Sequence, residues 1–213
     1  HKLGMATGAH IESAEGVRVG LEAGVDTIEH GADLTPELIA LFKENGVGRK
    51  SSLTCTVSPA LPFVELDPEK THSTEIQKVN GNIVYKGIVH AAQAALEAGI
   101  PVGLGTDSAC PYVTHYDMWR EVVYFERIVG APRKLAFHTA TLGNACILGL
   151  GDETGSIEVG KAADLIVLDE NPLYNLEALR QVKMVMARGK LISGLSVKHL
   201  PELDRELDTF LPR

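Results

Sequence analysis

The sequence predicts an α/β fold in which parallel strands alternate with helices and belong to a barrel-type sheet. Two nearly identical helix-to-strand junctions, Leu21–Val25 and Leu96–Ile100, each place a glycine where a helix would end. Strands that alternate with helices through short turns are typical of βαβ units and a parallel sheet. His10, His30 and Asp107 follow the expected strands at their carboxyl ends. This placement favours a barrel over a doubly wound sheet, because barrel sites lie at that face.

The size and composition of the chain exclude several classes of protein. The chain has 213 residues, enough for one large domain or a domain with a smaller module. Its formal charge of -8 argues against a nucleic-acid binder, and no apolar run approaches the roughly 20 residues of a membrane helix. Three widely spaced cysteines, Cys55, Cys110 and Cys146, suggest neither a disulfide framework nor a CxxC zinc site. We therefore expect a cytoplasmic protein that binds neither nucleic acid nor membrane.

The first elements have clear start signals. Ser13 can cap a helix in which Val17 and Leu21 recur at helical spacing. Thr35-Pro36-Glu37 offers a cap, a proline in the first turn and an acid near the positive end of the helix dipole. That second helix should stop at Gly46. The expected elements are strands at Met5–Ala9 and Val25–Glu29 and helices at Ala14–Ala23 and Pro36–Asn45.

The middle of the chain completes the predicted sheet. We expect a third strand near Val47–Val57 and then a functional loop over Ser58–Thr74, whose length exceeds that of a simple connection. A helix should begin near Gln77 or Ile83 and end at Ala98. Val102–Thr106 is a short apolar strand, and its alternation predicts that Gly103, Gly105 and Asp107 share one face.

The last part of the chain changes character at Gly151. Before it, we expect helices near Met118–Ile128 and from Pro132 to Gly149. After it, Gly155–Leu168 is turn and strand material, and Val182–Ile192 predicts a hairpin. Pro201–Phe210 is a candidate terminal helix. We therefore expect a barrel domain at residues 1–150 and a small β-sandwich segment with a terminal helix at 151–213.

The three strand-end residues form a candidate metal site. His10 and His30 each lie six residues after a glycine that would end a helix, and Asp107 follows a similar unit. Small residues before His10 and Asp107 would leave space beneath these side chains. Taken singly, each histidine is more simply interpreted as a core residue or as a residue that supports a ligand, and Asp107 could merely cap the next helix. As a set, two imidazoles and a carboxylate suit zinc or a similar divalent ion.

The motifs also resemble a known family. His10–Val17, Ala23–Gly31 and Gly103–Asp107 are similar to strand-end motifs of the amidohydrolase superfamily. Gly155–Leu168 resembles the strand with which that superfamily returns to its β-sandwich. The resemblance is strongest to the branch that contains imidazolonepropionase and the Xaa-Pro dipeptidases, and it covers nearly the whole chain.

The resemblance implies a fold and a reaction. The chain would be the second half of a (β/α)8 TIM-type barrel, strands five to eight, plus the C-terminal part of a small β-sandwich. His10 would bind metal from the fifth strand, His30 from the sixth and Asp107 from the eighth. A hydroxide held on one or two zinc or other divalent ions would attack an amide or cyclic amide C–N bond of a small molecule or dipeptide. Asp107 would also act as general base and acid.

The sequence departs from the family pattern in two respects. No His-x-His pair or strand-end lysine precedes His10, and Glu12 stands where many relatives have a second histidine. We therefore expect a fragment, or a chain completed by an N-terminal half on another polypeptide or by a homo-oligomer. Two further interpretations stay open: a non-catalytic scaffold that keeps the fold, and a deaminase of the same superfamily.

Two further histidines are candidates for contact with substrate. His115 lies in the loop after Asp107, and His72 lies in the long loop at residues 58–74. A solvated loop histidine is the simpler interpretation of each.

Overall fold

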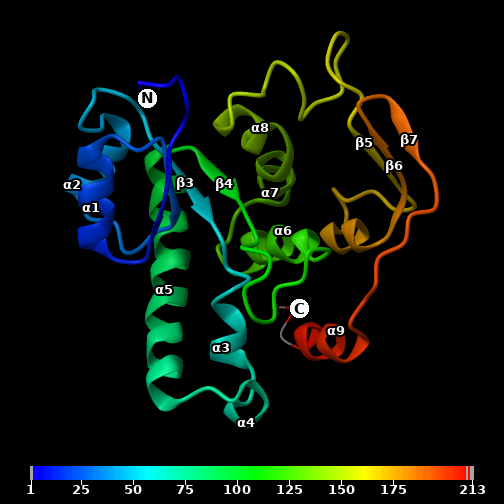
Figure 1. Ribbon diagram of the computed structural model, residues 1–213, viewed down its shortest axis with the longest axis horizontal. Coiled ribbons are helices and arrows are strands. Elements are labelled where there is room, and N and C mark those ends of the chain that lie inside the picture. The colour runs from blue at the N-terminus through cyan, green and yellow to red at the C-terminus, as the bar shows by residue number, and fades with distance from the viewer. Residues whose placement is uncertain (1, 210, 212–213) are drawn as a thin grey trace. The chain divides into compact units, whose positions relative to one another are not determined.

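The computed structural model describes residues 2–209 and 211, and its contacts divide the chain into two compact units (Figure 1). One unit runs up to Asp107 and the other begins at Ser108. Each unit is described by itself. The domain boundary expected at residue 150 stays a prediction.

The first unit is built on a parallel sheet. Its four strands are hydrogen-bonded in the order β1-β2-β3-β4, so each strand pairs with its neighbour in sequence. The α/β fold with a parallel sheet is thus confirmed. The strands are β1 (Gly8–Ile11), β2 (Thr27–His30), β3 (Ser52–Cys55) and β4 (Val102–Leu104). The helices are α1 (Ala14–Ala23), α2 (Pro36–Lys43), α3 (Leu61–Glu65), α4 (Pro68–Thr71) and α5 (Glu75–Ala98).

The core of this unit lies between the sheet and its helices. Ile28 of β2 and Leu21 of α1 are fully buried. At Gly20 of α1, an added Cβ atom would lie 2.7 Å from Cδ1 of Ile11 and 3.2 Å from Cδ1 of Ile28. The helix therefore packs closely on β1 and β2 at Gly20, and Ile11 and Ile28 identify the helix-facing side of the sheet.

Four predicted helix ends are confirmed, whereas α2 ends at Lys43, before the expected stop at Gly46. Ser13 accepts a hydrogen bond from the Gly16 amide, and Thr35 accepts one from Leu38. Gly24 and Gly99 end α1 and α5 in the left-handed conformation, with φ of 85° and 70°. Local signals therefore set these boundaries.

Other boundaries differ from the prediction. The segment at residues 58–74 is not one open loop, because it contains α3 and α4. Each of these helices has a proline in its first turn, and the Asp67 side chain caps α4. Helix α5 begins earlier than expected, because Thr74 and Gln77 form a capping box. Strand β4 ends at Leu104, three residues before Asp107, and the backbone at Asp107 is left-handed with φ 54°. The alternation expected for residues 103, 105 and 107 thus fails at Asp107.

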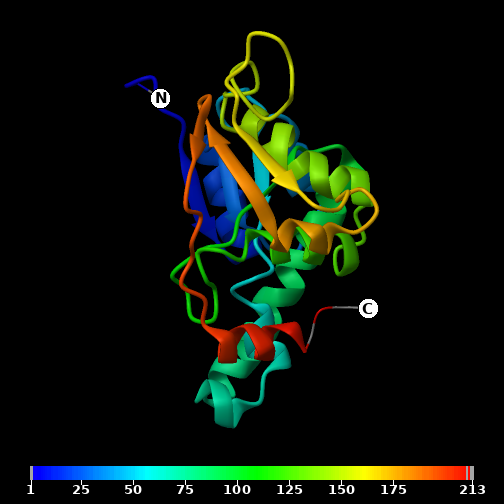
Figure 2. The ribbon, with the colours of Figure 1, turned by 90° about the vertical axis from the view of Figure 1, so that its right-hand side faces the viewer.

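The second unit combines helices with an antiparallel sheet ordered β5-β6-β7 (Figure 2). The predicted hairpin is confirmed: Arg188 and Gly189, both at positive φ, form its turn. Phe210, the predicted end of the last helix, lies outside the described residues. The elements are α6 (Met118–Arg127), α7 (Arg133–His138), the π-helical turn η1 (Thr139–Gly143), α8 (Asn144–Ile147), β5 (Leu165–Leu168), the 3-10 helix η2 (Leu176–Arg180), β6 (Val182–Ala187), β7 (Lys190–Ile192) and α9 (Pro201–Asp208).

Helix α6 anchors the last helix of this unit. Arg120 is 2% exposed, and its Nε lies 3.3 Å from Oδ2 of Asp117. A second guanidinium nitrogen of Arg120 lies 2.7 Å from Oδ1 of Asp208 in α9. A buried arginine thus joins two carboxylates from distant parts of the sequence.

Among the described residues, no helix is both long and apolar enough to cross a membrane.

Candidate metal centre

The structure brings two of the predicted ligands together. His10 lies on β1 and His30 ends β2, and their ring centroids are 4.6 Å apart at an interplanar angle of 80°. Glu12 joins them, because one ligand atom from each of His10, Glu12 and His30 lies within 4.8 Å of the others. Two imidazoles and a carboxylate at this spacing are a donor set that zinc and similar divalent ions accept.

The backbone turns His30 toward this cluster. Regular alternation would place His30 on the side of Ile28, which faces α1. Instead the His30 ring contacts His10, on the opposite face of the sheet. The φ of His30 is 72°, in the left-handed region. Gly31 follows with φ 89°, and its amide donates a hydrogen bond to the Ile11 carbonyl at 2.9 Å. We attribute the reversal to this left-handed pair, which redirects the side chain.

His30 has the environment of a neutral imidazole. It is 4% exposed, and its Nδ1 is hydrogen-bonded to Oγ1 of Thr56 at 2.6 Å. Burial lowers the pKa of His30, and neighbouring His10 lowers it further. A metal binds the neutral form of histidine, and the second ring nitrogen of a ligand usually has a hydrogen-bond partner. Because Nδ1 has its partner, Nε2 is the nitrogen left for a ligand, so the residues fit a divalent ion.

The space beneath His10 is not open, in contrast to the expectation. An added Cβ atom on Gly8 would lie 2.8 Å from Oγ1 of Thr27 and 3.1 Å from Oε1 of Glu29. Thr27 donates a hydrogen bond to Glu29 at 2.5 Å, so these side chains form a polar pair below the histidine. Glycine at position 8 therefore makes room for side chains of the neighbouring strand.

Asp107 lies at the end of the same sheet. Its negative charge acts on His30 and opposes the lowering of the His30 pKa. Asp107 is not a member of the three-residue cluster found among the described residues. The space at Gly105 is filled by Thr54 of β3 and by Thr56, which follows β3, since an added Cβ atom at Gly105 would lie 3.2 Å from Cγ2 of Thr54 and 3.4 Å from Cγ2 of Thr56. The ligand role of Asp107 stays a prediction.

Glu12 and Thr56 are the members of the site that sequence reasoning missed. The sequence marks Glu12 only as a departure from the family pattern. Its position two residues after His10 and one residue beyond β1 was the available signal, because alternation continued past the strand would place both residues on one face. Thr56 lies 26 residues from His30 in sequence, and no local motif links the two.

Neither of the two loop histidines, His72 and His115, belongs to the three-residue cluster found among the described residues. His72 is the exposed, left-handed residue that ends α4. His115 is exposed in the second unit, where its ring contacts Tyr116 with centroids 5.3 Å apart. Their contact with substrate stays a prediction.

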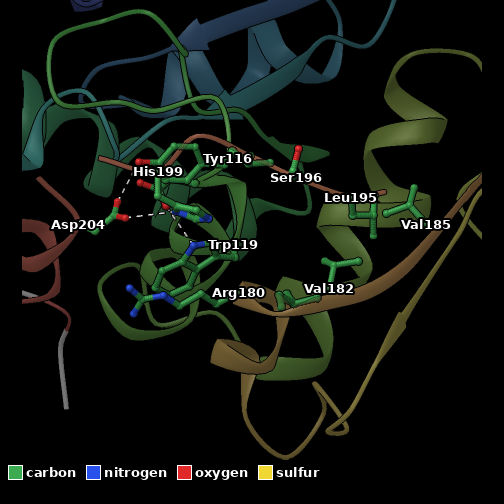
Figure 3. A pocket seen from close by; sticks show the side chains of 12 residues that line it. Tyr116, Trp119, Arg180, Val182, Val185, Leu195, Ser196, His199 and Asp204 are labelled. Carbon is green, nitrogen blue, oxygen red and sulfur yellow. Dashed lines mark hydrogen bonds and ion pairs between the residues drawn. The ribbon is translucent and has the colours of Figure 1, made fainter. Parts of the chain in front are cut away.

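The second unit has a pocket of its own, of about 360 Å³ (Figure 3). Two of its polar side chains pair with the Asp204 carboxylate: Tyr116 donates to Oδ1 at 3.0 Å, and Nδ1 of His199 lies 3.3 Å from Oδ2. Figure 3 shows Val182, Val185 and Leu195 lying away from this polar group. The polar residues of this pocket hold α9 in place.

In barrels of parallel strands, functional sites lie at the carboxyl ends of the strands, and His10, Glu12 and His30 gather at that end of this sheet. Residues 1–192 match the model of the amidohydrolase family, and the chain belongs to that family.

Solved structures agree with this assignment. The chain is similar to a putative prolidase from Bifidobacterium longum, with 43% identity and a TM-score of 0.95 over 98% of this chain and 52% of that chain. It is also similar to a Xaa-Pro dipeptidase with bound methionine in the active site, with 32% identity and a TM-score of 0.77 over 91% of this chain and 46% of that chain.

Two curated relatives are named as enzymes other than prolidases or dipeptidases. Ochratoxinase of Aspergillus niger is 29% identical over 192 residues, which is 87% of this chain and 38% of the relative. A 5-methylthioadenosine/S-adenosylhomocysteine deaminase of Bacillus thuringiensis (strain Al Hakam) is 32% identical over 129 residues, which is 55% of this chain and 29% of the relative. The chain thus spans about two fifths or less of these curated relatives and about half of the similar solved chains.

Proposed function

We propose that this chain forms the carboxyl-terminal half of a metal-dependent hydrolase that cleaves an amide or cyclic amide C–N bond. The convergence of His10, His30 and Glu12 at the carboxyl ends of β1 and β2 carries the proposal. In this assignment β1 to β4 are strands five to eight of a (β/α)8 barrel, and β5 to β7 belong to a small β-sandwich. The likeness to a putative prolidase and a Xaa-Pro dipeptidase supports a dipeptide or related small molecule as substrate.

The residues of the cluster would hold one or two divalent ions, with zinc the first choice for this donor set. His10 and His30 would supply imidazole nitrogens, and Glu12 or Asp107 a carboxylate oxygen. The bound ion would supply an activated water and would polarise the scissile carbonyl group.

Asp107 is the proposed proton carrier. Its carboxylate would take a proton from the attacking water and return it to the nitrogen of the leaving group. A carboxylate can do both steps only if it stays near the reacting atoms, and the end of β4 is such a place. The left-handed backbone at Asp107, with φ 54°, is the kind of local strain that gathers at functional sites.

A deaminase is the second candidate, because a 5-methylthioadenosine/S-adenosylhomocysteine deaminase is 32% identical over 129 residues. Both reactions break a C–N bond, and they differ in the leaving group. Release of ammonia from adenosine derivatives, with no cleavage of dipeptides, would favour the deaminase. A scaffold that keeps the fold would bind little metal and have no activity on either substrate.

The test uses this chain together with the half that supplies strands one to four. We expect about one or two divalent ions per barrel by elemental analysis, and hydrolysis of Xaa-Pro dipeptides. The Asp107→Asn variant should lose about 10²–10⁴-fold in kcat, the usual contribution of a general acid or base. The matched control is Asp33→Asn, which removes an exposed carboxylate paired with His90 at 2.9 Å and should keep full activity. A barrel without metal whose activity survives Asp107→Asn would contradict the proposal.

A further inference from the structure

Thr56 connects three strands of the sheet at the candidate metal centre. It directly follows β3, which lies between β2 and β4 in the sheet. Thr56 is 3% exposed and His30 is 4% exposed, and the hydrogen bond between Thr56 Oγ1 and His30 Nδ1 measures 2.6 Å. A short hydrogen bond between two buried groups fixes both more strongly than the same contact in water.

The two branches of the Thr56 side chain meet different strands. The hydroxyl reaches His30 at the end of β2. The methyl group lies beside Gly105 after β4, where an added Cβ atom would be 3.4 Å from Thr56 Cγ2. Because a β-branched side chain has few χ1 states, the methyl contact also fixes the direction of the hydroxyl. The hydroxyl is therefore aimed at His30 before any ligand binds.

We propose that Thr56 is a positioning residue that sets the ring orientation and tautomer of His30, so that Nε2 is the nitrogen that binds metal. The proposal rests on the proposed function. In a neutral imidazole one nitrogen carries the hydrogen and the other keeps a lone pair. When Nδ1 donates its hydrogen to Oγ1 of Thr56, the lone pair lies on Nε2. The ring is then ready to bind an ion without turning over.

The test compares three variants of the complete barrel. Thr56→Val keeps the branched shape but removes the hydroxyl, and Thr56→Ser keeps the hydroxyl. Thr54→Val is the matched control. Thr54 lies two residues earlier, on β3, and it also faces Gly105, where an added Cβ atom would be 3.2 Å from Thr54 Cγ2. Zinc affinity is measured by competition with a chelator. The His30 tautomer is followed in metal-free, 15N-histidine-labelled protein by NMR.

We expect Thr56→Val to weaken zinc binding about 10–100-fold, the usual effect of removing such a partner, and to lose the single His30 tautomer. Thr56→Ser should restore both within a few-fold, and Thr54→Val should change neither. Zinc affinity and tautomer unchanged in Thr56→Val would overturn the proposal, and so would a loss that Thr56→Ser fails to restore. If the parent barrel takes up no zinc, the proposed function fails. The tautomer measurement on metal-free protein then decides the role of Thr56 independently.

Discussion

At the scale of single residues, the candidate site depends on backbone conformations that residues other than glycine seldom adopt. His30 and Asp107 have φ of 72° and 54°. A left-handed residue with a Cβ atom costs about 1–2 kcal/mol, and such strain persists where the surrounding structure enforces it. Glycine would remove the strain but also the imidazole or carboxylate. At both positions the strained backbone slightly lowers the stability of the fold and keeps a functional side chain at the end of the sheet.

Gly46 gives a prediction at this scale. An added Cβ atom there would lie 1.8 Å from the Glu22 carbonyl oxygen, and the Gly46 amide donates to the Leu21 carbonyl at 2.9 Å. The backbone after α2 therefore touches the end of α1. Because backbone must move to relieve the clash, Gly46→Ala should lower the free energy of unfolding by about 3 kcal/mol or more.

The control for this prediction is Gly48→Ala. Gly48 has φ 72° and no atom within 4 Å of an added Cβ atom. Its substitution adds backbone strain only, so the loss should be about 1 kcal/mol. Urea unfolding of both variants measures the difference, and equal losses would show that the approach to Glu22 is not what requires glycine.

At the scale of elements, ion pairs attach the last helix, α9, to the rest of the second unit. Arg120 of α6 and Arg180 of η2 both pair with Asp208 in α9, and both guanidinium groups lie over the Trp119 ring. The Arg120 side chain is 3% exposed, whereas that of Arg180 is 38% exposed. Two arginines with the same partner thus occupy different solvent environments, and burial should decide their contributions to stability.

We predict unequal effects when each arginine is removed. Arg120→Met leaves the buried Asp117 carboxylate without its cation, which should lower the free energy of unfolding by about 3–5 kcal/mol. Arg180→Met removes a partly exposed pair and should cost about 1 kcal/mol or less. Urea unfolding gives the magnitudes, and limited proteolysis near residues 196–200 reports release of α9. Similar losses in the two variants would contradict the role assigned to burial.

At the scale of the whole molecule, the parallel sheet is open. Among the described residues, β1 and β4 each pair with a single neighbouring strand, so each lies at an edge of the sheet. Unpaired backbone groups at an edge can pair with another chain. A closed barrel has no such edges, so pairing with the proposed strands one to four would remove both of them.

The open sheet predicts association. The chain by itself should form oligomers whose size in gel filtration grows with protein concentration. Expression together with a half that supplies strands one to four should give a single species of defined mass. A chain that stays monomeric by itself at high concentration, with both edges exposed to solvent, would contradict this prediction.

The sequence by itself determined much of the local structure. Side-chain caps at Ser13 and Thr35, and the αL glycines Gly24 and Gly99, predict helix ends because each acts on backbone groups a few residues away. The hairpin at residues 182–192 follows from its turn residues in the same way. The capping box at Thr74 shows the limit, since this local signal was present and was missed. The motifs around His10 and His30 also indicated the family before any geometry.

Only the tertiary structure decided how the site is assembled. Alternation along a strand places His30 on the helix side, and one left-handed residue reverses that placement. Glu12 becomes a neighbour of both histidines, and Thr56 a partner of His30, because parallel strands bring together residues far apart in sequence. Periodicity and caps act within a few residues, whereas ring orientation, burial and donor spacing depend on contacts between strands. For this reason the sequence predicts candidate histidines, and the fold determines what each of them faces.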